Sequence, residues 1–219
     1  MDGYDLFLNS LYKVGHLHFS CFEIIRCTFV WKLISILLSK SIAMRKLLIE
    51  EMNRLSVEEF KESDKFPFVI VLDNIRSLNN VGSFFRTADA FRAEKMLLCG
   101  YTPNPPHREI TKSALGAENA VIWEKEENTL QAVLKLKEEG YQVFAVEQAE
   151  GSTLLQNFNP KPDVPCAFVF GNEVEGVADE VIDACDGCLE IPQFGTKHSF
   201  NIVISAGIVL WDFFAKMKL

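Results

Sequence analysis

Short apolar runs alternate along this chain with stretches whose apolar residues recur at helical spacing. The runs predict strands at Phe68–Leu72, Lys95–Cys99, Ala120–Trp123, Tyr141–Val146, Cys166–Phe170 and Cys188–Ile191. The spaced stretches predict helices at Val81–Phe91, Glu109–Leu115, Asn128–Glu139, Ala178–Ala184 and Ser199–Lys216. Apolar strands that alternate with helices indicate a mostly parallel sheet flanked by helices on both faces. We therefore predict an α/β fold.

The last predicted helix is apolar around most of its circumference. A helix that is apolar on nearly every side is buried on nearly every side. One face can pack on the sheet, so the other can meet a second subunit, and we expect a homodimer. Deeper burial in the core of a monomer is the alternative. The residues concerned are Ile202, Val203, Ile204, Ile208, Val209, Leu210, Trp211, Phe213 and Phe214.

The first 43 residues differ from the remainder. Their apolar run, Cys21–Leu38, is interrupted by Glu23, Arg26 and Lys32, unlike a membrane-spanning helix of about 20 apolar residues. No clear signal-peptide pattern is present. We expect residues 1–43 to be a non-core extension, with Met44 as a candidate native start; a membrane-associating helix is the alternative. An amphipathic segment, Leu47–Phe60, then leads into the folded domain, residues 44–219.

Composition narrows the class of protein. The 219 residues are 48% hydrophobic and 24% charged, as in a globular domain, and the formal net charge is −8. An acidic chain does not bind polyanions indiscriminately, although a local basic patch can still do so. Cys185 and Cys188 form one C-x-x-C without a second pair, so we expect reduced thiols in a cytoplasmic protein and no metal. The charges in the apolar run of residues 1–43 are the reason to expect no membrane partner.

The segment Val69–Phe91 is the most informative one. It combines a strand, a polar turn and a helix, and its Asn80, Gly82 and Arg86 form N-x-G-x-x-x-R. In open α/β sheets ligands bind where strand ends meet helix starts, and the free N–H groups of a helix start favour anions. Taken alone, the segment could also be an ordinary turn with a solvated arginine.

Two later segments follow strands in the same way. Phe170–Val177 contains Gly171 and Gly176, which permit close backbone approach. Ile191–Ile202 joins the last strand to the last helix, for which Ser199 is the predicted N-cap. A dinucleotide-binding G-x-G-x-x-G motif is absent from the sequence.

Together the three segments resemble the SpoU (TrmH) family of RNA ribose methyltransferases, in the SPOUT superfamily. That family has N-x-G-x-x-x-R, G-N/S-E-x-x-G and I-P-x-x-G-x-x-x-S-x-N in this order; Phe200 stands where leucine is usual. The resemblance implies a C-terminal trefoil knot, a homodimer and S-adenosylmethionine (SAM) held largely by backbone. The implied cofactor-binding residues are Phe170, Gly171, Asn172, Gly176, Ile191, Pro192, Phe194 and Phe200.

The resemblance further implies methyl transfer to a ribose 2′-hydroxyl of tRNA or rRNA. Arg86 is then the catalytic residue, and Asn80, Glu173, Ser199 and Asn201 orient it, the substrate and the cofactor loops. Because a guanidinium stays protonated in proteins, we favour Arg86 as an oriented cation over Arg86 as a base.

Cations in or near these segments are candidates for RNA phosphate contacts, and each could equally be a solvated surface charge. They are Arg76, Arg92, Arg108, Lys112 and Lys197. Two other functions remain open: a catalytically inactive RNA-binding protein that keeps the SPOUT fold, and a nucleotide-binding α/β protein with different chemistry.

Overall fold

A computed structural model describes residues 44–217 of the chain. The chain divides between Arg54 and Leu55 into two compact units. The extension expected at residues 1–43, with its apolar run, lies outside the described residues.

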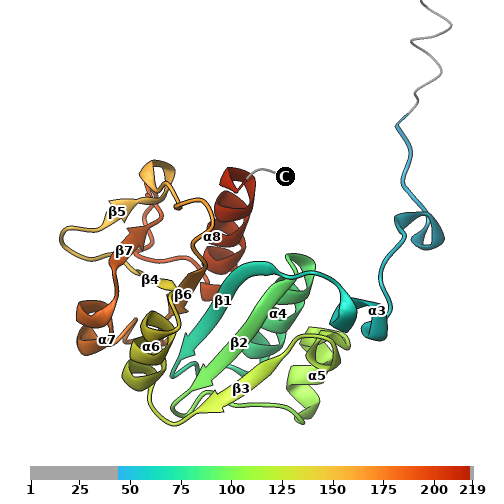
Figure 1. The fold of residues 1–219 in the computed structure, drawn as a ribbon, viewed down its shortest axis with the longest axis horizontal. Coiled ribbons are helices and arrows are strands. Elements are labelled where there is room, and N and C mark those ends of the chain that lie inside the picture. Colours follow the sequence, from blue (N-terminus) through green and yellow to red (C-terminus); the bar gives the residue numbers. More distant parts are fainter. Residues whose placement is uncertain (1–43, 218–219) are drawn as a thin grey trace, which may run out of the picture. The chain divides into compact units, whose positions relative to one another are not determined.

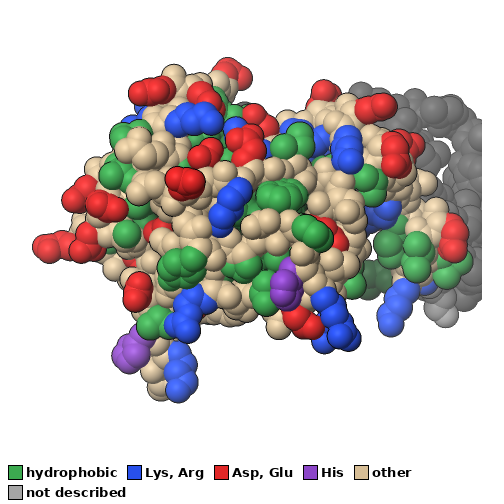
Figure 2. Space-filling model, turned by 90° about the horizontal axis from the view of Figure 1, so that it is seen from below, with side chains coloured by type: hydrophobic (Ala, Val, Ile, Leu, Met, Phe, Trp, Pro, Cys, Tyr) green, Lys and Arg blue, Asp and Glu red, His purple; other side chains and the backbone are tan. Residues whose placement is uncertain are grey.

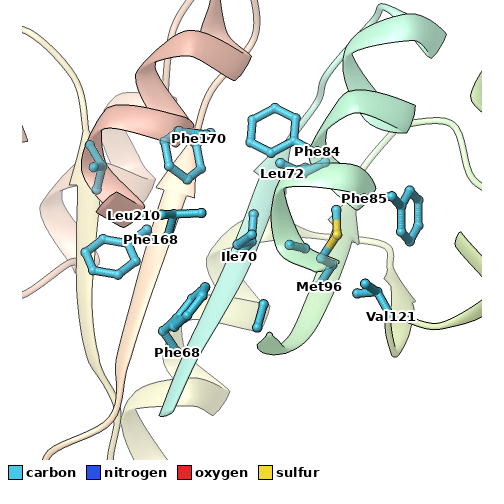
Figure 3. Packing of buried hydrophobic residues seen from close by; sticks show 14 of the residues in the cluster. Phe68, Ile70, Leu72, Phe84, Phe85, Met96, Val121, Phe168, Phe170 and Leu210 are labelled. Atoms are coloured by element: carbon cyan, nitrogen blue, oxygen red, sulfur yellow. The ribbon is translucent and has the colours of Figure 1, made fainter. Parts of the chain in front are cut away.

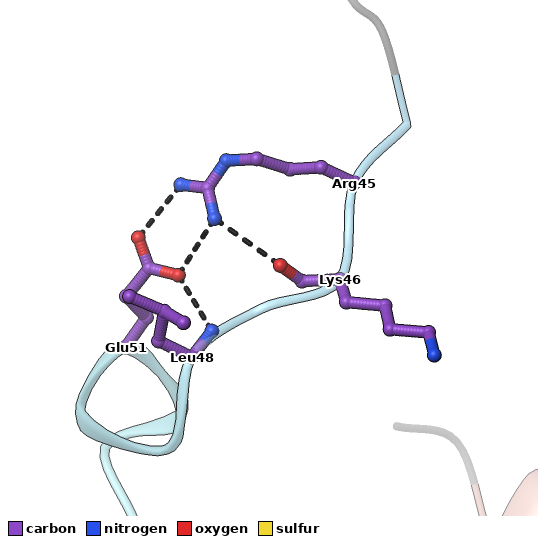
Figure 4. A network of polar contacts seen from close by, with 4 residues as sticks. All are labelled: Arg45, Lys46, Leu48 and Glu51. Carbon is purple, nitrogen blue, oxygen red and sulfur yellow. Dashed lines mark hydrogen bonds and ion pairs between the residues drawn. The ribbon is translucent and has the colours of Figure 1, made fainter.

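The described part of the first unit is short and exposed. It holds one turn of 3₁₀ helix, η1 (Ile49–Met52). The Arg45 guanidinium donates two hydrogen bonds of 2.8 and 2.7 Å to Glu51, whose carboxylate also accepts from the Leu48 N–H (Figure 4). The bonds from Arg45 and then Leu48 lower the pKa of Glu51 to about 2. Such exposed ion pairs contribute little to stability.

The amphipathic pattern expected across Leu47–Phe60 does not form one element. Asn53 has a left-handed backbone (φ 48°) that ends η1. A separate helix, α3 (Val57–Glu62), starts in the second unit and buries only Phe60. The intervening hydrophobic residue Leu55 is exposed.

The second unit contains a seven-stranded parallel sheet in the order β3-β2-β1-β6-β4-β7-β5 (Figure 1). The strands are β1 (Phe66–Asp73), β2 (Ala93–Cys99), β3 (Trp123–Glu126), β4 (Gln142–Val146), β5 (Thr153–Leu154), β6 (Cys166–Phe170) and β7 (Gly187–Glu190). The helices are α4 (Leu78–Ala90), α5 (Arg108–Ala114), α6 (Thr129–Glu138), α7 (Asp179–Ala184) and α8 (Ile202–Lys216), with 3₁₀ turns η2 (Ala117–Asn119) and η3 (Leu155–Asn157).

Alternation along β1 produces two cores, one on each face of the sheet. Phe68, Ile70 and Leu72 point into a core with α4, α5 and α8 (Figure 3). Val69 and Val71 point into the opposite core with α6 and α7. Because successive side chains of a strand point to opposite faces, an apolar run without polar interruptions requires helices on both faces. The predicted α/β architecture is confirmed.

The strand predicted at Ala120–Trp123 is wrong. Ala120 and Val121 follow the turn η2 and pack into the core, and β3 begins only at Trp123. β3 pairs with β2 alone, so it is an edge strand, and its residues after Trp123 are charged. An edge strand buries less surface, so its sequence need not be apolar. The two-residue strand β5 was not predicted.

Gly82 lies inside helix α4, rather than at the junction of strand and helix. A Cβ atom at this position would lie 2.0 Å from the Ser113 Oγ and 2.4 Å from the Ile110 carbonyl oxygen, both on α5. The glycine of the first motif therefore permits close contact between α4 and α5.

Gly82→Ala should lower the free energy of unfolding by about 2–3 kcal/mol, because an overpacked contact costs this amount when backbone must move. Gly207→Ala is the matched control, since Gly207 lies inside α8 with nothing within 4 Å of its added Cβ. That control should be neutral or stabilise by up to about 1 kcal/mol. Urea denaturation of both variants tests this; equal stabilities would contradict the packing role.

Candidate functional site

The candidate site lies at the carboxyl ends of β1 and β6, adjacent strands in the sheet. From β1 the chain continues to β2 and β3 on one side, whereas β4, β7 and β5 lie on the other side of β6. Ligands bind at such a reversal of strand order in open α/β sheets. The turns that follow β1 and β6 meet here.

Glu173, after β6, caps the start of helix α4, after β1. Its carboxylate accepts hydrogen bonds from the backbone N–H groups of Arg76 and Ser77, both at 3.0 Å, and from Asn80 Nδ2 at 2.8 Å. Ser77 Oγ in turn accepts from the Asn80 N–H as the helix N-cap. A negative charge is favourable at this end of a helix. One carboxylate thereby joins the first motif to the second.

These bonds determine the proton affinity of Glu173. Burial alone would raise the pKa of this carboxyl, but hydrogen bonds from Arg76, Asn80 and Ser77 outweigh that cost, and the pKa is lowered. A carboxylate with a lowered pKa and engaged lone pairs is a poor general base. The geometry of Glu173 instead fits a residue that positions the Asn80 side chain.

The lowered pKa predicts a pH-dependent effect of Glu173→Gln. A group whose folded-state pKa is depressed stabilises the fold above its unfolded pKa, about 4.3 for Glu, and loses that contribution as pH falls through the folded value. The stability difference between parent and Glu173→Gln should be largest above about pH 5 and shrink toward pH 3. Glu175→Gln is the control, since the Glu175 carboxylate makes no hydrogen bond within residues 44–217. Urea denaturation at several pH values tests this; a constant difference would contradict the prediction.

Asn172 holds the turn after β6 closed. Its buried side chain donates to the Asn74 carbonyl at 2.8 Å and to the Tyr101 hydroxyl at 2.7 Å, and accepts from the N–H groups of Val174 and Glu175. Backbone bonds of 2.9 Å run both ways between Asn172 and Gly176. The closed turn thus belongs to a hydrogen-bonded network that includes the loops after β1 and β2.

Two glycines make this closed turn possible. A Cβ on Gly171 would lie 2.1 Å from the Gly176 carbonyl carbon and from the Val177 nitrogen. Gly176 has φ +73°, and its Cβ would meet Glu147 Oε2 at 2.4 Å. Side chains at either position would collide with neighbouring atoms. Steric contacts therefore explain why glycine stands at both of these positions, which the sequence had singled out.

A cavity of about 290 Å³ opens beside this turn. Of the residues singled out from the sequence, those that line it are Phe170, Gly171, Asn172, Glu173, Gly176, Ile191, Ser199, Phe200 and Asn201. They come from the turn after β6 and from the connection between β7 and α8. The structure thus brings the second and third motifs together around one space.

The cavity also has walls outside the three segments named from the sequence: Val146, Glu147, Gln148, Leu189 and Ser205. Within those segments, Val174, Gln193 and Ile202 line it as well. Glu147 accepts from the Val177 N–H at 3.2 Å, and Gln148 Nε2 donates to the His198 carbonyl at 2.6 Å. Both residues directly follow β4. The rule applied to β1 and β6, that polar residues after a buried strand mark a site, would have found them.

The predicted helix N-cap at Ser199 is wrong. Helix α8 starts at Ile202, and Asn201 is its N-cap, with Asn201 Oδ1 accepting from the Val203 N–H at 2.9 Å. Asn201 Nδ2 lies 3.4 Å from Asn80 Oδ1. The asparagine of the third motif therefore starts the last helix and contacts the first motif.

Arg86, Pro192 and Phe194 do not line this cavity. Arg86 lies six residues beyond Asn80, which places it about 9 Å farther along the helix and about 240° around it. Its side chain is exposed and makes no hydrogen bond or ion pair with the described residues. Phe194 is 95% exposed. Among residues 44–217, Arg86 makes no hydrogen bond or ion pair with Glu173 or Asn201, so the expected meeting of these residues is not seen there.

Four of the five phosphate-contact candidates are exposed, in loops or a helix that follow the carboxyl ends of strands: Arg76, Arg108, Lys112 and Lys197. Figure 2 views the side toward which the arrows of β1–β3 point in Figure 1, and Lys and Arg side chains stand on it among acidic ones. Lys112 lies 3.9 Å from Glu109 in an exposed pair.

Arg92 was placed wrongly near the motif loops. It directly precedes β2, at the amino edge of the sheet, and its guanidinium lies over the Phe66 ring.

The described cysteines are free thiols, and burial raises the pKa of Cys185 to about 12. Residues 44–217 contain no group of three or more His, Cys, Asp or Glu side chains that could hold a metal ion. Within the same range, no helix is both long and apolar enough to cross a bilayer.

Comparison with known proteins gives matches over the sheet and the three motifs. The model of the SpoU rRNA Methylase family matches residues 67–211. A putative TrmH family tRNA/rRNA methyltransferase of Staphylococcus haemolyticus is 28% identical over 160 residues, 73% of this chain and 63% of that protein. The chain thus spans less than two thirds of that relative. The tRNA (guanosine(18)-2′-O)-methyltransferase of Aquifex aeolicus is 27% identical, over 75% of this chain and 77% of that protein.

Among solved structures, an rRNA methyltransferase of Sinorhizobium meliloti with bound AdoMet superposes with a TM-score of 0.63 and 28% identity. The superposition covers 70% of this chain and 58% of the other.

Proposed function

The chain belongs to the SpoU rRNA methylase family, and from this premise we propose that it transfers the SAM methyl group to a ribose 2′-hydroxyl of tRNA or rRNA. One observation carries the proposal: segments from the second and third motifs enclose one cavity. Asn80 of the first motif is hydrogen-bonded to Glu173 and Asn201, which line that cavity. The names of the relatives support it. The methyltransferase domain is proposed to be residues 44–219.

The cavity suits SAM in size and in lining. Its volume of about 290 Å³ is near the lower end of small-molecule sites, about 300–1,000 Å³. Glu147 and Glu173 contribute carboxylates, and no Lys or Arg is among the described residues that line it. A sulfonium cation is favoured in such surroundings. Backbone of the closed turn after β6 and of Ile191 would hold the cofactor.

The residues of this chain must position the ribose and manage its proton. SAM, when bound, supplies a methyl group already activated by the sulfonium. Catalysis then requires in-line alignment of the 2′-hydroxyl and stabilisation of its oxygen as its proton passes to solvent water. Asn80, bonded to Glu173 and Asn201, both of which line the cavity, would orient polar groups beside it. Arg86 is proposed to act as a cation that grips a phosphate and stabilises the developing ribose alkoxide.

RNA is proposed to lie across the carboxyl edge of the sheet. Arg76, Arg108, Lys112 and Lys197 would contact its phosphates there. Such contacts position the RNA without reading its sequence, so they are compatible with either tRNA or rRNA.

The exposed apolar surface of α8 supports a homodimer. Ile204 is 54% exposed and Trp211 60% exposed, on the helix that also contributes the buried residues Ala206, Val209, Leu210 and Phe213 to the core. Covering such residues with a second copy would remove apolar area from water. Sedimentation equilibrium tests this, since the dimer has twice the mass of the chain. The trefoil knot and a cytoplasmic location stay predictions.

Two measurements test the proposed function. Calorimetry should detect SAM binding to the full chain, and its absence would refute the enzyme proposal. Mapping of 2′-O-methylation in total RNA, with and without the gene, should identify a nucleotide that loses its methyl group. SAM binding without any methylated RNA would instead favour the catalytically inactive alternative.

A further inference from the structure

Tyr101 follows β2 in the loop that leads to α5, and the residue is 57% exposed. The polar ends of this residue are nevertheless engaged. Its hydroxyl accepts from Asn172 Nδ2 at 2.7 Å, and its backbone N–H donates to Asn74 Oδ1 at 3.1 Å. Tyr101 is thus attached to the turns after β1 and β6, which form the candidate site.

The loop around Tyr101 is held from several directions. Lys125 Nζ donates to the carbonyls of Gly100 and Thr102, each at 2.6 Å. The buried Thr102 hydroxyl accepts from the Ile75 N–H and donates to the Leu72 carbonyl. These bonds restrict both neighbours of Tyr101, so the ring is positioned before any ligand arrives.

A glycine brings this loop against the turn after β1. Gly100 has φ +59°, and a Cβ there would lie 2.0 Å from Asn74 Oδ1. The close approach permits the bond between Asn74 and the Tyr101 N–H. The sequence and fold therefore place an aromatic residue beside the site, with its hydroxyl bonded to Asn172 and much of its surface in water.

We propose that the ring of Tyr101 is a preorganised stacking platform for a nucleobase of the substrate RNA. Bases stack on fixed aromatic side chains in RNA recognition, because every base has a π-face. A ring held at both ends loses little conformational entropy when a base stacks on it. This inference rests on the proposed function, since it requires RNA as the substrate.

The test compares Tyr101→Leu with Tyr101→Phe in the full chain. The probe is total RNA from cells that lack the gene, and methyl incorporation gives kcat and KM. Tyr101→Leu should raise KM about 5- to 150-fold, the range for one stacked base, without altering the affinity for SAM. Tyr101→Phe keeps the ring and loses the bond to Asn172, so its KM should stay near that of the parent.

The two variants separate stacking from a structural role. If the only role of Tyr101 is the hydrogen bond from Asn172 to its hydroxyl, KM should rise equally in Tyr101→Phe and Tyr101→Leu, and this result would overturn the inference. An unchanged KM in Tyr101→Leu would overturn it as well. Arg108→Gln is the control for phosphate contacts, since it should reduce the salt dependence of KM, which Tyr101→Leu should preserve. A parent that neither binds nor methylates RNA would refute both proposals, whereas an active parent with an unaffected Leu variant refutes only this one.

Discussion

Replacing Arg86 by alanine is expected to slow methyl transfer to RNA by about 100- to 1,000-fold, the usual loss when one electrostatic donor to a developing oxyanion is removed. SAM affinity should remain that of the parent, because Arg86 does not line the cavity. Its exposed guanidinium makes no described ion pair that the substitution would break. Single-turnover transfer of labelled methyl groups, together with calorimetry for SAM, measures both quantities.

Two further variants show whether a loss of rate in Arg86→Ala comes from the guanidinium or from a disturbed helix. Asn79→Ala changes another exposed position of α4, seven residues before Arg86, and should retain parent activity, which controls for effects on the helix. Arg86→Lys keeps the charge and loses the planar fork, so near-full activity in Arg86→Lys would argue against a geometric clamp on phosphate. A parent-like rate in Arg86→Ala would remove Arg86 from the mechanism.

Gly171→Ala is expected to abolish the cavity as a ligand site. The added Cβ would lie 2.1 Å from backbone atoms of Gly176 and Val177, and backbone cannot move aside as a flexible side chain can. The turn must open, which breaks the paired bonds between Asn172 and Gly176. We expect a loss of about 3 kcal/mol in stability and a SAM affinity at least about 100-fold weaker.

Gly195→Ala is the matched control for this substitution. Gly195 lies in the connection before α8, and nothing lies within 4 Å of its added Cβ. Its stability should therefore equal that of the parent by urea denaturation. Tight SAM binding by a folded Gly171→Ala protein would show that the closed turn is dispensable.

Local patterns predicted the central strands well and the periphery less well. β6 was predicted with its observed bounds, Cys166–Phe170, because both of its faces are buried and every residue is apolar. The prediction misplaced β3 because an edge strand pairs with only one neighbouring strand. The apolar residues Ala120 and Val121 suggested a strand, but they follow a turn and pack into the core. Burial produces the apolar pattern, so a strand with little burial leaves a weak one.

The start of α8 was misjudged for a related reason. Ser199 and Asn201 are both common N-caps, and spacing alone does not separate them. The choice depends on where the connection after β7 meets α4, since Asn201 also contacts Asn80.

The α/β class, the positions of the buried strands and the polar residues that follow them can be predicted from the amino-acid sequence, because they are consequences of local periodicity and residue type. That β6 lies beside β1 is a property of the folded chain, and it carries Glu173 to backbone groups 96 and 97 positions earlier in the chain. The tertiary structure also decided that Gly82 serves helix packing, that Glu147 enters the cavity and that Arg86 stays outside it. Such contacts join segments distant in sequence, and their energies depend on strand order, which no local pattern contains.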